Sequence, residues 1–283
     1  PSCKQPYEPS HTELRQLGVD PDHTGAVTLH RAVGCERCDD TGYRGRIGMF
    51  EAFLIDGAEA RRLDAEWARM HRMRTGDMPT RLALMDQQGV DIQVLSPSGI
   101  SQYTLWADPE TSLEWERRLN NGLAEMVAQV PGRFVGLGSV PLHAPELAVK
   151  EMTRCMGELG LRGIQIGSHA AVMELGDARM KPFWAAAERL GAALFLHPAG
   201  ITDKRFAPYH LWNSLGQPLE EAMAMASLWY EGVLDEFPKL KICVAHGGGY
   251  LPYYAGRVDR NYQDKPYTRV HMRKKPSDYI KHN

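Results

Sequence analysis

Two histidines are candidate catalytic or metal-binding residues, because each lies at the end of a short apolar run. His197 ends the run at 193–197 and is followed by a proline, whereas His246 ends the run at 241–246 and is followed by three glycines. Neutral imidazole is a preferred Zn²⁺ ligand and carries protons near neutral pH. One such histidine is more often structural, but two in equivalent places favour a metal-dependent or acid–base site. The glycines could instead cradle a phosphate, although the strand–GxGxxG–helix pattern of such sites is absent.

Cysteines near the N-terminus form a second set of candidate ligands. Cys35 and Cys38 make a CxxC, whose turn can direct both thiolates at one Zn²⁺, and Cys3 could be a third ligand. On spacing alone, the pair could equally be ordinary loop cysteines. No fourth cysteine is nearby, and the fourth ligand could be His11, His30 or a cysteine upstream of Pro1. This pattern indicates a candidate structural zinc site that is separate from the two histidines.

The two histidines belong to a repeating pattern that places them at one edge of a predicted sheet. Short apolar runs, partly β-branched or aromatic and bounded by glycine or proline, alternate with helical stretches. The runs cover 92–96, 134–140, 163–167, 193–197 and 241–246, and the helical stretches cover about 110–130, 145–159, 179–191, 218–236 and 251–262. Such consecutive units predict a parallel sheet with helices outside it, and their spacing favours a barrel over a doubly wound sheet. Catalytic residues lie at the C-terminal rim of such barrels, where both histidines would fall.

Composition places the chain among soluble globular proteins. Its 283 residues suffice for an α/β barrel of roughly 250 residues, and 43% of them are hydrophobic. The formal net charge of −2 gives no bias toward nucleic acid or anionic membranes, and no run of ~18 apolar residues predicts a membrane span. The 5 cysteines, without an export signal, argue against a disulfide framework and favour the cytoplasm.

Several segments resemble the amidohydrolase-related decarboxylases of the aminocarboxymuconate-semialdehyde decarboxylase-like family. The similarity covers about 60–283 and is carried by the segments MDQQGVDIQVLSPSG, RFVGLGSVPLHAPELAVKEM, GIQIGSH, AAAERLGAALFLHPAG and GVLDEFPKLKICVAHGGGYLPYYAGRVDR. The resemblance implies a divalent metal, zinc or alternatively manganese, at the rim of a TIM-type (β/α) barrel of the amidohydrolase superfamily. It also implies non-oxidative loss of CO₂ from a small unsaturated or aromatic carboxylic acid, with metal-dependent hydrolysis as the alternative.

The same resemblance implies roles for individual residues. His197 matches a metal-binding histidine, and His246 matches a catalytic histidine beside the metal-bound water. Arg257 matches an arginine that reaches a substrate carboxylate across a homodimer interface, and Arg69 could be a second substrate arginine. Trp212 falls in the loop that covers the site, where packing within the loop is an equal alternative to a substrate contact.

The first residues resemble a different family, the C-terminal zinc module of type II secretion ATPases. The match is specific at 34–51, but no P-loop is present, so this segment would not hydrolyse ATP. We therefore expect a zinc-ribbon-like segment at 1–56 and an amidohydrolase-related barrel domain at 57–283. The alternatives to an enzyme are a zinc-binding module without activity and a scaffold that only binds partners.

The barrel part departs from the family in its metal ligands. No His-x-His or Glu-x-His motif precedes the predicted strands, and no aspartate motif of an eighth strand is found. Because we find no counterpart of the first, seventh and eighth strands, we expect an incomplete barrel in a chimera or a fragment. Catalytic zinc uses about three protein ligands, and one histidine ligand remains here. We therefore expect little or no turnover from these residues alone.

Overall fold

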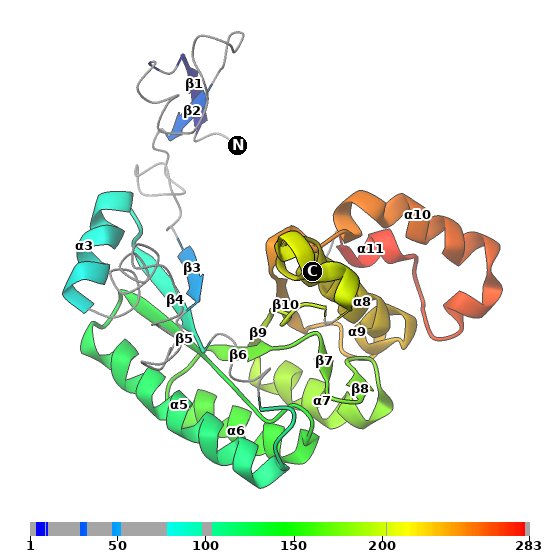
Figure 1. Ribbon diagram of the computed structural model, residues 1–283, viewed down its shortest axis with the longest axis horizontal. Coiled ribbons are helices and arrows are strands. Elements are labelled where there is room, and N and C mark those ends of the chain that lie inside the picture. Colours follow the sequence, from blue (N-terminus) through cyan, green and yellow to red (C-terminus); the bar gives the residue numbers. More distant parts are fainter. Residues whose placement is uncertain are drawn as a thin grey trace.

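A curled sheet of six parallel strands forms the centre of the structure, a computed structural model (Figure 1). The structure describes residues 4–8, 10, 29–32, 47–51, 78–97, 104–201 and 203–280. In the order in which they pair, the strands are β10 (Lys241–Val244), β9 (Ala193–Leu196), β6 (Gly163–Ile166), β5 (Phe134–Gly138), β4 (Ile92–Ser96) and β3 (Ile47–Glu51). Every pairing in this sheet is parallel, which confirms the predicted α/β class and the apolar runs as strands.

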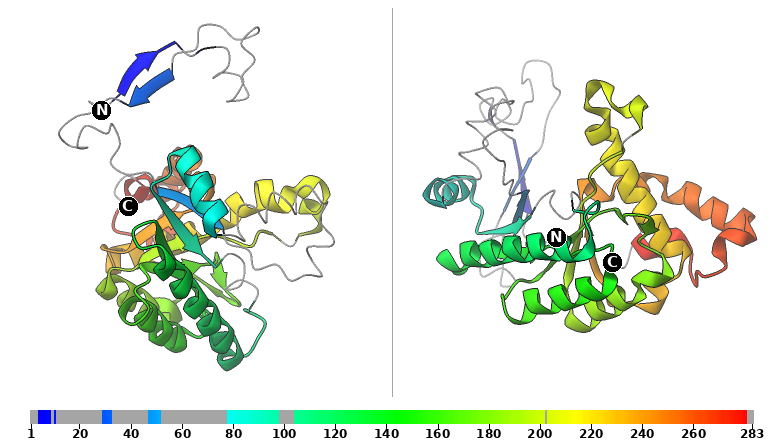
Figure 2. Two further views of the ribbon diagram at one scale, coloured as in Figure 1. Left: turned by 90° about the vertical axis from the view of Figure 1, so that its left-hand side faces the viewer. Right: turned by 60° about the horizontal axis from the view of Figure 1, so that its bottom comes forward.

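Helices follow the strands and cover the outer face of the sheet. α5 (Pro109–Gln129), α6 (Pro145–Gly157) and α7 (Lys181–Leu190) lie along this face, with α6 between the other two (Figures 1 and 2). Other helices are α3 (Met78–Gln88), α8 (Gln217–Tyr230), α9 (Val233–Glu236), α10 (Leu251–Asp264) and α11 (Pro276–Ile280). None of the helices in the described ranges is both long and apolar enough to cross a membrane.

Shorter elements lie in the connections. They are the hairpin of β7 (His169–Ala170) and β8 (Met173–Glu174), the 3₁₀ turns η3 (Ala178–Met180), η4 (Lys204–Phe206), η5 (Pro208–His210), η7 (His246–Gly248) and η8 (Pro266–Arg269), and the π-helical turn η6 (Trp212–Gly216). Most of these follow the carboxyl ends of β6, β9 and β10, so the loops at that edge of the sheet carry structure of their own.

β3 adds a strand on the N-terminal side of the predicted barrel. It pairs in parallel with β4, with Ile47 opposite Ile92 and Glu51 opposite Ser96. The sheet therefore has a strand at a place where we expected none. A short apolar run cannot be assigned by its pattern alone, which is why this strand escaped the sequence analysis. The division of the chain into 1–56 and 57–283 stays a prediction.

The N-terminal segment contributes an antiparallel pair, β1 (Lys4–Tyr7) and β2 (Leu29–Ala32), in which Lys4 stands opposite Ala32. The predicted zinc ligands and the second substrate arginine lie outside the described residues, and so they stay predictions. They are Cys3, Cys35, Cys38 and Arg69.

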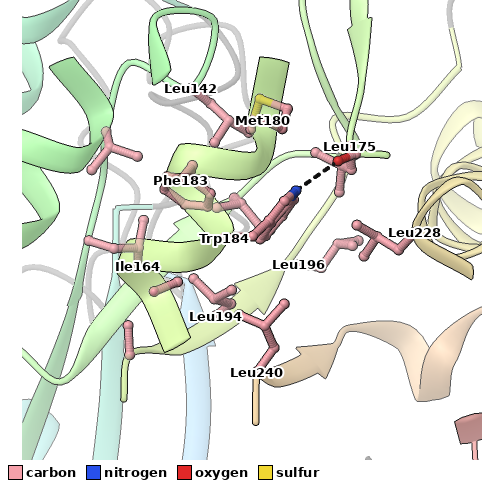
Figure 3. Packing of buried hydrophobic residues seen from close by; sticks show 14 of the residues in the cluster. Leu142, Ile164, Leu175, Met180, Phe183, Trp184, Leu194, Leu196, Leu228 and Leu240 are labelled. Atoms are coloured by element: carbon pink, nitrogen blue, oxygen red, sulfur yellow. Dashed lines mark hydrogen bonds between the residues drawn. The ribbon is translucent and has the colours of Figure 1, made fainter. Parts of the chain in front are cut away.

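The main core lies between the sheet and its helices. Along β9, Leu194 and Leu196 point to the helices and join Trp184 of α7 in this core (Figure 3). Trp184 donates its Nε1–H to the carbonyl oxygen of Leu175 at 3.0 Å, so the polar atom of this fully buried ring is satisfied (Figure 3). Burying a large aromatic ring typically stabilises a fold by about 3–5 kcal/mol relative to alanine.

The inner face of the sheet holds a second, smaller cluster. Side chains alternate along a strand, so Phe195 of β9 and the next alternate residue, His197, face inward. Phe195 packs with Leu137 and Ala245 in this inner cluster. The inner face therefore has a small apolar cluster beneath the strand ends that carry the histidines, next to the buried side chain of Gln165.

One predicted helix is divided in two by a glycine. The stretch at 218–236 forms α8 and α9, because Gly232 between them adopts a left-handed φ of 71°. A side chain at this position would also run into the carbonyl oxygen of His271. Glycine alone tolerates both constraints, and it ends the helix there.

A buried carboxyl group on α5 joins the helix layer to the loop after β4. Glu116 is fully buried, and its Oε1 accepts hydrogen bonds from Thr104 Oγ1 at 2.9 Å and Ser112 Oγ at 3.4 Å. Its other oxygen has no hydrogen-bond partner among the residues that the structure describes. Burial raises the pKa of Glu116 to about 8, because the charged form loses its contact with water.

We expect Glu116 to make the folded state less stable as the pH rises. Between its ordinary pKa of 4.5 and its folded pKa of about 8, the folded state binds the proton more tightly than the unfolded state. Its effect on stability is therefore neutral below the ordinary pKa and grows more unfavourable up to the folded pKa. Urea unfolding midpoints measured from about pH 5 to about pH 9 should fall more steeply for the native chain than for Glu116→Gln.

Glu125→Gln, on an exposed position of the same helix, is the matched control and should follow the native chain. Equal slopes for the native chain and Glu116→Gln would show that this carboxyl group is ionised in the folded state.

Candidate active site

His197 and His246 lie side by side at the carboxyl ends of two neighbouring strands. The backbone N–H of His197 donates to the carbonyl oxygen of Ile166 at 2.9 Å, which extends the ladder between β9 and β6. The backbone N–H of Ala245 donates to the carbonyl oxygen of Leu196 at 3.0 Å, which extends the ladder between β10 and β9. The two ring centroids are 5.0 Å apart, with 56° between the ring planes. The strand order therefore brings the two predicted residues together.

The two rings differ in exposure. His197 is 9% exposed, and its ring lies 5.8 Å from that of Phe195, centroid to centroid. The side chain of His246 is 34% exposed. A buried imidazole held against the sheet suits a fixed ligand, whereas the more exposed ring can meet both substrate and water. Their roles in a reaction stay predictions.

The backbone at His246 takes a conformation that is uncommon for a residue with a side chain. Its φ is 46°, and Gly247, Gly248 and Gly249 follow with φ values of 69°, 82° and 62°. Left-handed backbone at a residue other than glycine costs on the order of 1–3 kcal/mol and is concentrated at functional sites. A side chain on Gly249 would run into the carbonyl oxygen of Pro218. The glycine therefore lets α8 lie directly against the loop that carries His246.

A buried carboxyl group on α8 contacts His246, and the sequence analysis missed it. Oε1 of Glu221 is 2.6 Å from Nδ1 of His246, and Glu221 is fully buried. Burial raises the pKa of Glu221 to about 8. In the sequence, two adjacent glutamates within a helical stretch are typical of a solvated face. No local signal distinguishes the one that is buried.

The first turn of α8 holds the loops after three neighbouring strands. Nε2 of Gln217 donates to the carbonyl oxygen of Pro198 at 3.0 Å, after β9. Ser168 Oγ donates to Oε2 of Glu220 at 2.6 Å, after β6. Glu221 makes the third contact, after β10. Residues separated by three and four positions share one face of a helix, so a single helical face organises this edge of the sheet.

The other predicted substrate contacts in the described residues lie in the connection after β9 and on α10. Trp212 begins η6, and a side chain on Gly200 would come within 3.1 Å of its ring. Because Gly200 lies in the loop that follows His197, Trp212 covers this loop. Arg257 is exposed on α10.

Of the described residues, one is predicted to be a metal ligand at the strand ends. His197 offers a buried imidazole at the strand end. Within the described residues, no group of three or more His, Cys, Asp or Glu side chains is arranged to hold a metal ion.

Comparisons with known proteins give a consistent set of relatives. A 2-amino-3-carboxymuconate-6-semialdehyde decarboxylase from Dictyostelium discoideum is 37% identical over 215 residues, which are 75% of this chain and 57% of that protein. A gamma-resorcylate decarboxylase from Polaromonas sp. is 32% identical over 234 residues, which are 78% of this chain and 71% of that protein. The chain thus spans little more than half the length of the first relative.

The fold agrees with these relatives. The structure of a dihydroxybenzoic acid decarboxylase from Polaromonas sp., with bound manganese and the inhibitor 2-nitroresorcinol, matches with a TM-score of 0.73 at 29% identity. The match covers 84% of this chain and 76% of that chain. The family model described as Amidohydrolase matches residues 39–283, which includes β3 and begins before residue 57. From the parallel sheet, the paired histidines and this match, we conclude that the chain belongs to the amidohydrolase family.

Proposed function

We propose that the protein is a metal-dependent, non-oxidative decarboxylase of a small unsaturated or aromatic carboxylic acid. The observation that carries the proposal is the contact between His197 and His246 at the carboxyl ends of neighbouring strands. Relatives that are 37% and 32% identical are named as decarboxylases of such acids, which supports this reaction. Metal-dependent hydrolysis is the alternative, because the same pair of side chains could serve either chemistry.

In this proposal His197 is one ligand of a divalent metal ion, zinc or manganese. Manganese is bound in the similar structure from Polaromonas sp., and imidazole is a common ligand of zinc. When bound, the metal would polarise an oxygen of the substrate. The chain's own side chains would add proton transfer and carboxylate binding.

His246 would supply the proton that replaces the carboxyl group. Loss of CO₂ breaks a carbon–carbon bond and leaves its electron pair on the substrate. A proton from the His246 ring would then form the new carbon–hydrogen bond. The side chain is 34% exposed, so the ring can regain its proton from water.

A homodimer would complete the site by presenting Arg257 of the partner subunit to the substrate carboxylate. Tyr253 and Tyr254 are exposed beside Arg257 on α10, Tyr253 at 88%, and Leu215 is exposed on η6. Tyr250 Oη donates to the carbonyl oxygen of Leu215 at 3.0 Å, which joins these two elements. Grouped apolar surface of this kind marks interaction sites. A guanidinium group suits a carboxylate because it can bind both oxygens.

Arg69 and Trp212 are the remaining proposed substrate contacts. Trp212 lies against the loop that follows His197, a position from which a ring can close over a bound substrate. We place the reaction in the cytoplasm, which an odd number of cysteines supports, since the sequence has 5.

The ligand count alone predicts little or no turnover, but the proposed function requires some, and we expect it to be slow and to depend on His246. The chain would be incubated with Mn²⁺ or Zn²⁺ and either 2,6-dihydroxybenzoate or 2-amino-3-carboxymuconate 6-semialdehyde, and CO₂ release measured. His246→Ala should lower kcat by about 10²–10⁴-fold, because it removes the proton donor. His271→Ala, at an exposed position, is the control. The proposal fails if no CO₂ is released from either substrate, or if His246→Ala keeps the native rate.

We expect Arg257 to act in the site of the partner subunit. Arg257→Ala should raise KM for the carboxylate substrate, whereas Arg260→Ala, one turn along the same helix face, should not. Mixing Arg257→Ala with His246→Ala should restore activity to about a quarter of native, because half the dimers are mixed and each then holds one intact site. No restoration on mixing, with dimers present, would place Arg257 in its own subunit's site.

A structural zinc in the N-terminal segment is a second proposal, which accords with its resemblance to the zinc module of secretion ATPases. Its ligands would be Cys3, Cys35 and Cys38, which lie outside the described residues. The observation that supports this zinc site is the antiparallel pairing of β1 with β2, in which Lys4 lies opposite Ala32. In the sequence, Lys4 directly follows Cys3, and Ala32 precedes Cys35 by three residues.

We expect this zinc to depend on the CxxC and not on His197 or His246. Purified protein should contain zinc by mass spectrometry, and the double variant Cys35→Ser with Cys38→Ser should lose one equivalent. Cys243→Ser is the control, since Cys243 is a free cysteine in the barrel part. Unchanged zinc content in the double variant would refute this site.

A further inference from the structure

We propose that Glu221 is the positioning residue of His246, holding its ring by Nδ1 so that Nε2 is the nitrogen offered to the substrate. The inference rests on the proposed function of His246 and deepens it. Its basis is the 2.6 Å contact between Oε1 of Glu221 and Nδ1 of His246, which is the length of a strong, charge-assisted hydrogen bond.

Burial of Glu221 makes this contact important. Glu221 is fully buried, and its second oxygen has no hydrogen-bond partner among the described residues. A buried carboxyl group with few partners is costly, so the bond to His246 carries much of its compensation. Removing His246 would leave the buried carboxyl group of Glu221 without this partner.

The helix that carries Glu221 is fixed on both sides of the site. Gln217 and Glu220, on the same face of α8, bond to the loops after β9 and β6. Gly249 lets α8 approach, because a side chain there would run into Pro218 and lie 3.2 Å from Cβ of Glu221. The carboxyl group is therefore held at one place relative to the strand ends.

The backbone of His246 explains why such an anchor is needed. Its left-handed φ of 46° is not a relaxed conformation for histidine, and glycines follow it. A loop of this kind does not fix the ring by itself. The hydrogen bond to a rigid helix does so.

The bond also selects the form of the ring. When the carboxylate of Glu221 accepts the Nδ1–H of His246, the neutral ring keeps its lone pair on Nε2. The ring can then take up a proton at Nε2, the carboxylate balances its charge, and the same proton passes to the substrate carbon. Nδ1 keeps its proton throughout. The ring therefore takes up one proton at Nε2 and gives one proton to the substrate carbon, and it returns to its neutral form.

Nuclear magnetic resonance of the metal-free protein tests this inference without any reaction. Two-bond ¹H–¹⁵N spectra of ¹⁵N-histidine protein report which ring nitrogen carries the proton, and the signals absent in His246→Gln identify His246. At about pH 9, above the pKa of about 8 of Glu221, we expect the Nδ1–H form in the native chain. Glu221→Ala should shift His246 to the tautomer mixture of an exposed histidine.

Two further variants keep the test decisive. Glu221→Gln preserves side-chain volume, and its amide can donate to Nδ1, so it should favour the Nε2–H form even if Glu221→Ala does not fold. Glu220→Gln, one residue earlier on α8, bonds to Ser168 instead and should leave the His246 signals unchanged. Native-like His246 signals in a folded Glu221→Ala or Glu221→Gln protein overturn the inference.

Kinetics separate this inference from the proposed function. Glu221→Gln should lower kcat about 10- to 100-fold and change KM by less than about twofold, because Glu221 acts through His246. If the native chain releases no CO₂, the proposed function fails while the spectra still decide the inference. A variant that raises KM and leaves kcat unchanged would assign Glu221 to substrate binding and overturn it.

Discussion

The parallel pairing of β9 with β10 is the interaction on which the site depends. Its register sets Leu196 opposite Val244, so the two strands end at the same level and their loops begin side by side. Neighbouring strands lie about 4.8 Å apart, which agrees with the 5.0 Å between the two imidazole rings. A slip of one residue would turn each side chain to the opposite face and send His197 into the core beneath the helices. The register that buries Leu194 and Leu196 is thus the one that presents the histidine.

A second constraint acts on the loops rather than on the strands. The first turn of α8 bonds to the segments that follow three neighbouring strands, and Gly249 permits its close approach. A hydrogen bond to a charged group contributes about 1.5–3 kcal/mol, while left-handed backbone at a histidine costs about 1–3 kcal/mol. When Glu221 is ionised, its bond to His246 is therefore comparable in energy with the strain in the loop. This balance explains how a strained residue is kept in one orientation.

Much of the fold and half of the site could be predicted from the sequence. The strands were recognisable because each is a short apolar run bounded by glycine or proline, and the histidines because they end such runs. β3 could not be assigned, since a short apolar run is ambiguous by its pattern alone. Glu221 could not be found, because its burial depends on where α8 docks, and that contact spans 25 residues of sequence. The break at Gly232 follows from a close approach to His271, which the sequence pattern also does not show.

The central claim is that His197 and His246 form one site in which the first binds a metal ion and the second serves the reaction. A crystal structure of the protein soaked in Zn²⁺, with anomalous diffraction measured across the zinc absorption edge, tests it most directly. The account predicts an anomalous peak about 2.0–2.1 Å from a ring nitrogen of His197, with His246 next to the ion and still bonded to Glu221. Zinc bonded to Nδ1 of His246, where it would replace the bond to Glu221, would contradict the account. Zinc bound elsewhere, with none at His197, would also contradict it.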